Sequence, residues 1–240
     1  MRLLLTRPEA DAERTAAALR IRGHTVAIAS LLRIEPLPDA EIGAGPWAAI
    51  LVTSANAARA IAAHKRLAEL QALPVLAVGE RSAQAMRAVG FADVSSAEGA
   101  ASDLTRLAAE RLKRGAPLLH LAGADRSGDI AADLAAQNFL VRTAVVYRAV
   151  PANVVPPAAT EALADAIDGV LHFSRRSAET YVNLTRHAGL AEPALKKPAH
   201  FCLSAQVAEP LAQAGAVDIR IAREPTEAGV LALVPATAAG

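Results

Sequence analysis

The sequence has little cysteine, few aromatic side chains, almost no net charge and no long apolar run. Its single cysteine, Cys202, excludes an internal disulfide and fits a reducing compartment. Only 3% of the residues are aromatic although 53% are hydrophobic, so Ala, Val, Leu and Ile must build the core. A net charge of +1 gives no reason to expect nucleic acid or a membrane as partner. Charge follows Met1 too soon for a signal peptide, and no membrane span occurs, so we expect a cytoplasmic protein.

Short apolar runs alternate with helical patterns along the whole chain. Several of the helical patterns end in Gly, the residue that best tolerates a left-handed helix terminus. Alternation of this kind predicts an α/β fold whose parallel sheets are covered by helices on both faces. The predicted strands are residues 2–6, 25–30, 47–53, 74–78, 92–95, 117–121, 141–147, 169–174, 199–204 and 217–221.

The two halves of the chain resemble each other in three blocks that occur in the same order. The offset between the halves grows by five residues from one block to the next, which Ala-rich composition does not explain. We therefore predict two copies of one five-stranded unit. Matched pairs are Leu3 with Leu118 (118 − 3 = 115), Ser54 with Ser174 (174 − 54 = 120) and Gly90 with Gly215 (215 − 90 = 125).

Two proline-marked segments, residues 33–38 and 148–157, follow matching strands of the two copies. They are the best places for the chain to cross between domains. Each domain boundary would then fall inside a copy. The expected result is two lobes joined by a two-stranded hinge, with a cleft between them.

Ligands of open parallel sheets bind beyond the carboxyl ends of the strands, where loops lead into helices. In this sequence those loops are rich in Ser, Thr, Gly and Arg and contain very few carboxylates. Hydroxyls, backbone amides and helix dipoles favour anions there, although any one of the serines can equally be a helix N-cap. The candidate binding residues are Arg7, Thr53, Ser54, Asn56, Gly79, Ser82, Ser174, Arg176 and Ser204.

Other chemistries lack the residues that they need. Ser54 has no G-x-S-x-G context and no histidine at a matching strand end, so we do not expect a nucleophile. The histidines form no i, i+4 pair, and His200 with Cys202 indicates packing, so no metal site is predicted. No glycine-rich nucleotide motif occurs.

Tyr147 ends an apolar strand next to the second proline-marked segment. It is either a packing aromatic whose hydroxyl reaches water or a proton donor that faces the cleft. Tyr181 lies inside a helical pattern and is expected in the core.

The order of the segments LTRP, VTSANAARA, LAVGERSAQAMRAVGF, LAGADRSGDIAADLAAQNFLVRTAVVYRAVP, LHFSRRSAETYV and LSAQVAEPLAQAG resembles the uroporphyrinogen-III synthase family across essentially the whole chain. The closing Pro225-Thr226-x-Ala228 segment adds to the likeness. The resemblance implies two flavodoxin-like lobes, each with a five-stranded parallel sheet: residues 1–35 with 151–240, and residues 36–150.

The implied activity is that of a lyase in heme biosynthesis. It would close the linear tetrapyrrole hydroxymethylbilane with loss of water and inversion of ring D, without metal or organic cofactor, as a monomer. The family's tyrosine at this strand end, here Tyr147, would donate a proton to the leaving hydroxyl, since a phenol is protonated at neutral pH.

Two loops depart from the family pattern. Ser174-Arg175-Arg176 stands where Ser-Pro-Ser is common, and Ser204-Ala205-Gln206-Val207 replaces Gly-x-Thr-Thr. The competing hypothesis is a non-catalytic, two-lobed cytoplasmic binder of a small polyanion.

Overall fold

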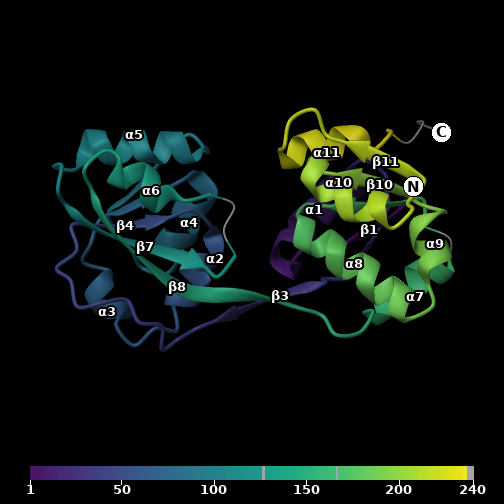
Figure 1. The fold of residues 1–240 in the computed structure, drawn as a ribbon, viewed down its shortest axis with the longest axis horizontal. Coiled ribbons are helices and arrows are strands. Elements are labelled where there is room, and N and C mark those ends of the chain that lie inside the picture. The colour runs from purple at the N-terminus through teal and green to yellow at the C-terminus, as the bar shows by residue number, and fades with distance from the viewer. Residues whose placement is uncertain (126–127, 166, 237–240) are drawn as a thin grey trace. The chain divides into compact units, whose positions relative to one another are not determined.

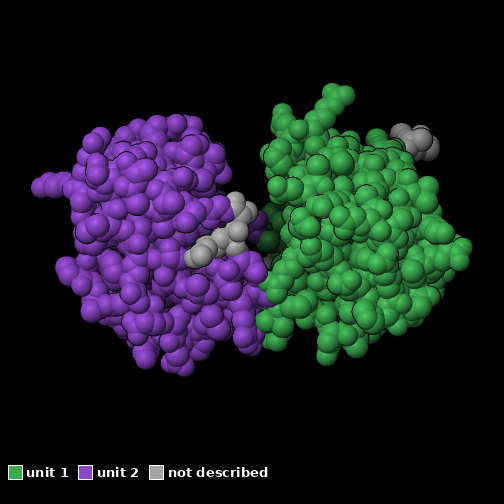
Figure 2. All heavy atoms as spheres, in the orientation of Figure 1, with its two compact units in different colours: residues 1–33, 150–240 green, residues 34–149 purple. Residues whose placement is uncertain are grey.

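The computed structural model describes residues 1–125, 128–165 and 167–236 (Figure 1). The chain divides into two compact units, coloured separately in Figure 2. Unit 1 comprises Met1–Arg33 and Val150–Gly240, and unit 2 comprises Ile34–Ala149. Within the described ranges, no helix has the length and apolar character needed to span a membrane.

Unit 1 is built on a five-stranded parallel sheet in the order β11-β10-β9-β1-β2. Its strands are β1 (Arg2–Leu5), β2 (Thr25–Ile28), β9 (Gly169–His172), β10 (Ala199–Cys202) and β11 (Asp218–Ile221). Its helices are α1 (Glu9–Ile21), α7 (Pro157–Ala164), α8 (Arg175–His187), α9 (Ala191–Leu195), α10 (Ala205–Gln213) and α11 (Glu227–Leu233).

Unit 2 is built on a six-stranded sheet in the order β3-β8-β7-β4-β5-β6. Its strands are β3 (Leu32–Pro36), β4 (Ala49–Val52), β5 (Val75–Ala77), β6 (Val94–Ser96), β7 (Pro117–Gly123) and β8 (Leu140–Pro151). Its helices are α2 (Ala55–Ile61), α3 (Leu67–Leu70), α4 (Glu80–Ala88), α5 (Ala101–Arg111) and α6 (Ile130–Ala135). The predicted α/β class with two largely parallel sheets is confirmed.

The prediction of five strands in the second sheet is wrong by one, because β3 adds an antiparallel edge. The Leu37 amide donates to the Val146 carbonyl at 2.8 Å, and the Ala152 amide donates to the Leu31 carbonyl at 2.9 Å. As the residue number rises along β3, the number of its partner on β8 falls, so the two strands are antiparallel. β8 is long enough to pair with both β7 and β3. The prolines of this segment end the strand at Pro36 rather than preventing it, as proline is tolerated at a sheet edge.

The two sheets repeat the same strand pairing. Leu3 lies opposite Gly169 in unit 1, and Leu118 lies opposite Ala49 in unit 2 (118 − 3 = 115; 169 − 49 = 120). The pairings β1–β2, β9–β10 and β10–β11 correspond in the same way to β7–β8, β4–β5 and β5–β6. A one-residue error in an offset would place every side chain of the matched strand on the opposite face of the sheet. The agreement of these pairings therefore confirms the offsets read from the sequence. Each sheet takes two of these strands from one copy and three from the other.

Both faces of each sheet are buried, which explains the continuous apolar runs of the strands. In β1, Leu4 belongs to the core cluster under α7, α8 and α10, whereas Leu3 and Leu5 belong to the cluster under α1 and α11. Alanines such as Ala12 and Ala16 are fully buried on α1 and let that helix pack closely on the sheet. With both faces covered, the strand ends are where the sheets can meet a ligand.

Candidate functional site

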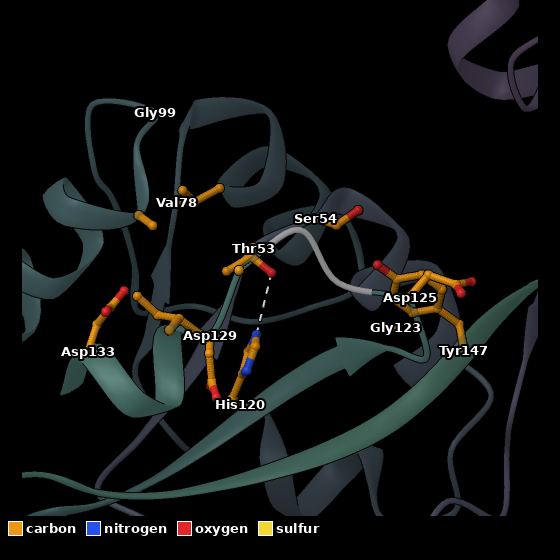
Figure 3. Close-up of a pocket in the computed structure, with 13 residues that line it drawn as sticks. Thr53, Ser54, Val78, Gly99, His120, Gly123, Asp125, Asp129, Asp133 and Tyr147 are labelled. Atoms are coloured by element: carbon orange, nitrogen blue, oxygen red, sulfur yellow. Dashed lines mark hydrogen bonds between the residues drawn. The ribbon is translucent and has the colours of Figure 1, made fainter. Parts of the chain in front are cut away.

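A pocket of about 350 Å³ lies at the carboxyl edge of the unit 2 sheet (Figure 3). It is centred on the neighbouring strands β4 and β7. The connection after β4 leads to β5 on one side of this pair, and the connection after β7 leads to β8 on the other side. Such a switch point is the usual ligand site of an open α/β sheet. Its lining residues are Thr53, Ser54, Val78, Gly99, Ala101, His120, Gly123, Asp125, Gly128, Asp129, Ile130, Asp133 and Tyr147.

Tyr147 reaches the pocket from β8, and its side chain is half-buried. A β-bulge between Ala122 and Gly123 places Gly123 opposite Tyr147 instead of Val146. The Ala124 amide donates to the Tyr147 carbonyl at 2.9 Å and fixes the backbone on both sides of the bulge. Bulges beside functional sites commonly redirect one side chain, and here the redirected group is a phenol.

Thr53 follows β4 directly and is exposed to the pocket. Its hydroxyl lies 3.4 Å from Nε2 of His120, and the dashed line in Figure 3 marks this interaction. His120 is a side chain of β7 and is only 3% exposed. The sequence expectation considered only histidines at matching strand ends, and His120 is not at one. His120 lies before the end of its own strand, and the β4–β7 pairing brings it beside Thr53. An imidazole can give or take a proton, so His120 adds a group able to do so to the pocket that contains Tyr147.

The pocket also contains more carboxylates than predicted. Asp125, Asp129 and Asp133 line it, and Oδ1 of Asp129 accepts a hydrogen bond from the Ala132 amide at 3.2 Å, capping α6. The sequence expectation considered only the loops directly after strands, whereas Asp129 and Asp133 enter from the following helix. Across the part of the chain that the structure describes, no three His, Cys, Asp or Glu side chains gather as metal ligands.

Three predicted binding residues of unit 2 do not line the pocket. Asn56 accepts a hydrogen bond from Arg59 at 2.7 Å on the surface of α2. Gly79 is the N-cap of α4, and Ser82 lies buried within that helix at 5% exposure. Of the candidates in this unit, the structure brings Thr53, Ser54 and Tyr147 together in one pocket.

Arg7 of unit 1 follows β1 and is 9% exposed. Its guanidinium carbon lies 4.2 Å from the ring centroid of Phe173, and Nη1 lies 3.2 Å from Oε1 of Glu227. These contacts connect the end of β1 to α11. A cation held in this way already has an anionic partner, so its predicted contact with a substrate carboxylate would compete with Glu227.

The other unit 1 candidates stand at helix starts. Oγ of Ser174 accepts from the Ser177 amide at 3.1 Å and caps α8, while Arg176 is partly exposed on the first turn of the same helix. Ser204 is the N-cap of α10 without a side-chain capping bond. Ser174 thus has the same local role as its repeat counterpart Ser54.

Replacing Ser54 with Ala is expected to destabilise unit 2 by about 1 kcal/mol, because Oγ of Ser54 accepts from the Asn56 amide at 3.2 Å. Ser204→Ala is the matched control: without a capping bond, it is expected to change stability by only a few tenths of a kcal/mol. Urea denaturation of the variants measures both values. Equal losses at the two serines would show that the Ser54 bond does not cap α2.

Comparison with known proteins adds the family. A family model described as uroporphyrinogen-III synthase HemD matches residues 13–232. The chain belongs to this family. No curated protein matches the chain.

The solved structure of one uroporphyrinogen-III synthase shares the fold at low identity. The Helicobacter pylori enzyme is 18% identical, with a TM-score of 0.66 over 97% of this chain and 98% of that one. The wild-type Thermus thermophilus enzyme is also 18% identical, with a TM-score of 0.44 over 97% and 96% of the two chains.

Within this synthase family member, His120, Asp129 and Asp133 are among the pocket residues that sequence reasoning missed. His120 had one usable signal: at the offset of 115 it corresponds to Leu5, a core leucine (120 − 5 = 115). A histidine in a buried strand where the other copy has leucine marks a position with an additional constraint. The aspartates had no such signal, because acidic residues are common in the first turns of helices.

Proposed function

We propose that this chain closes hydroxymethylbilane to uroporphyrinogen III, with loss of water and inversion of ring D through a spiro intermediate. The match of the uroporphyrinogen-III synthase family model over residues 13–232 carries this proposal. The pocket at the switch point of unit 2 supports it, because it presents a phenol, hydroxyls and an imidazole together.

In the proposed reaction, Tyr147 donates its phenolic proton as the C–O bond to the ring A hydroxyl breaks, and water leaves. Ring D then attacks the ring A methylene carbon through its substituted carbon, which gives the spiro intermediate. The bond from that carbon to the methylene bridge of ring C breaks, and the bridge re-forms its bond at the free α carbon of ring D. That carbon releases its proton, which restores the phenol, so substrate and products differ by one water. Holding the chain for this attack is mainly a matter of positioning, for which the fixed backbone around Tyr147 is suited.

The pocket is suited to different parts of the tetrapyrrole on its different sides. Thr53 and Ser54 provide hydroxyl donors for an acetate or propionate group. Asp125 and Asp133 repel such groups, but they are acceptors for pyrrole N–H groups. Further binding roles for Arg7, Asn56, Gly79, Ser82, Ser174, Arg176 and Ser204 stay part of the proposal.

We also propose that each unit is a flavodoxin-like lobe. Counted along each unit by repeat position, the strands stand in the order 2-1-3-4-5, which is the flavodoxin-like order. The hinge formed by β3 and β8, the cleft, the monomeric state and the cytoplasmic location stay predictions. Size-exclusion chromatography with light scattering tests the monomer.

An assay that supplies hydroxymethylbilane and resolves the product isomers tests the function. The expected product is uroporphyrinogen III, formed in proportion to the amount of protein. Accumulation of only the type I isomer, which forms spontaneously, would contradict the synthase and favour the alternative of a non-catalytic polyanion binder.

A further inference from the structure

Gly123 lines the pocket, and its lack of a side chain leaves room for the ring of Tyr147. A Cβ atom built on Gly123 would lie 2.6 Å from Cε2 and 2.7 Å from Cζ of Tyr147, and 3.0 Å from its hydroxyl. Real Cβ atoms do not approach other heavy atoms this closely. The Tyr147 ring therefore occupies the space that any other residue at position 123 would fill.

The backbone at Gly123 does not itself require glycine. Its φ lies outside the left-handed range, unlike that of Gly115, which has a φ of +83°. Glycine is thus not needed here for conformational freedom. The reason for glycine is therefore the close approach of the Tyr147 ring, and position 123 helps to place that ring.

The chain on both sides of the ring is held in place, so an added methyl group would displace the ring and not the strands. The pairing of β7 with β8 runs from Pro117 to Gly123, and the bond from the Ala124 amide to the Tyr147 carbonyl closes it. The atoms in conflict with the new Cβ are the far end of a half-buried side chain, which can rotate toward the open pocket.

The repeat shows that this arrangement is not a general need of the fold. At the offset of 115, Gly123 corresponds to Pro8 and Tyr147 to Leu32 (123 − 8 = 115; 147 − 32 = 115). The equivalent pairing of β1 with β2 ends three residues earlier, at Leu5 (8 − 5 = 3). The longer ladder with its bulge, its glycine and its tyrosine occurs in unit 2 and not at the equivalent place in unit 1.

We propose that Gly123 is a positioning residue: its missing side chain fixes where the Tyr147 hydroxyl stands in the pocket. This inference rests on the proposed role of Tyr147 as proton donor. Gly123→Ala would leave the phenol present but displace it by roughly 1 Å, and misplacement on that scale lowers rates by about 100-fold.

A double-mutant cycle tests the proposal with four proteins: the natural chain, Gly123→Ala, Tyr147→Phe and the double variant. Gly123→Ala is expected to lower kcat by about 100-fold with KM nearly unchanged. In the Tyr147→Phe background, the same change is expected to have no further effect on kcat, because the hydroxyl that it misplaces is already gone. Thermal unfolding is expected to show that all four proteins fold.

Tyrosine ring NMR provides a readout that does not depend on activity. The chain has two tyrosines, so ¹³C-tyrosine labelling gives two ring environments, which Tyr147→Phe assigns. Gly123→Ala is expected to shift the Tyr147 signal and leave that of Tyr181, a core residue of unit 1, unchanged.

Three results would overturn the proposal. The first is an equal loss of kcat on Gly123→Ala in both backgrounds, which would assign Gly123 a role unrelated to the hydroxyl. The second is an unchanged Tyr147 ring signal. The third is an unfolded Gly123→Ala, which would show that the backbone yields instead of the ring. If Tyr147→Phe alone leaves kcat unchanged, the proposed role of Tyr147 fails first, and the cycle shows this separately.

Discussion

Replacing Tyr147 with Phe is expected to lower kcat by a factor of about 10² to 10⁴, the usual contribution of a general acid. The change removes one oxygen and keeps the ring that packs beside Gly123, so the pocket keeps its shape. KM is expected to stay within about threefold, since the hydroxyl acts on the leaving group and not on the substrate's carboxylates. Initial rates of hydroxymethylbilane consumption, corrected for spontaneous cyclisation, measure the effect.

Tyr181→Phe is the matched control, because it removes the same oxygen from the other tyrosine. The Tyr181 hydroxyl donates to the Ala194 carbonyl at 2.9 Å within the core of unit 1. Its loss is expected to cost about 1 kcal/mol of stability and to leave kcat unchanged. A Tyr147→Phe protein with the natural kcat would move the proton donation to His120 or to water.

The strands were predictable because both sheets are buried on both faces. A strand such as β4 must then be apolar at every position, and its four residues, Ala49 to Val52, are indeed all buried. All ten predicted strands occur in the structure. The repeat offsets contributed more than the runs themselves, since they specify register, which no single run can reveal.

Two features were not predicted from the sequence as they occur, because tertiary pairing decides them. The segment that forms β3, Leu32–Pro36, contains charged residues and ends in proline, and the sequence placed it in the hinge and not at the edge of the unit 2 sheet. It becomes a strand because β8 extends to Pro151 and offers an unpaired edge. The place of His120 in the pocket was not predicted either. Its contact with Thr53 exists because β4 and β7 are neighbours in the sheet, although they are distant in the chain.

A buried histidine pair is expected to make unit 1 lose about 3 kcal/mol of stability between pH 6.5 and pH 4. His172 and His200 are fully buried, and Nε2 of His172 lies 3.2 Å from Nδ1 of His200. The Tyr181 ring packs edge-on against both imidazoles. Burial lowers the pKa of His200 to about 4, and burial together with the charge on His200 lowers the pKa of His172 well below its usual range.

The sign follows from the unfolded chain, in which both imidazoles have their ordinary pKa near 6.5. Above that pH neither state takes up a proton, and the full stability is present. As the pH falls toward 4, the unfolded state binds protons that folded His200 resists, so stability declines. Each tenfold difference in proton affinity is about 1.4 kcal/mol, and His200 alone gives the expected loss. The Leu195 carbonyl and Asp218 oppose the shift without cancelling it.

Unit 2 provides both the control and the variant for this prediction. At the repeat offsets, His172 and His200 correspond to Val52 and Val75, which are buried in the core of unit 2 (172 − 52 = 120; 200 − 75 = 125). Amide hydrogen exchange is expected to show β9 and β10 losing protection between pH 6.5 and 4, after correction for the intrinsic rates, while β4 and β5 do not. The His172→Val/His200→Val double variant should remove that difference, because it gives unit 1 the pair that unit 2 already has. A pH dependence that persists in the double variant would assign the loss to surface carboxylates, and equal loss in both units would exclude the histidine pair as its cause.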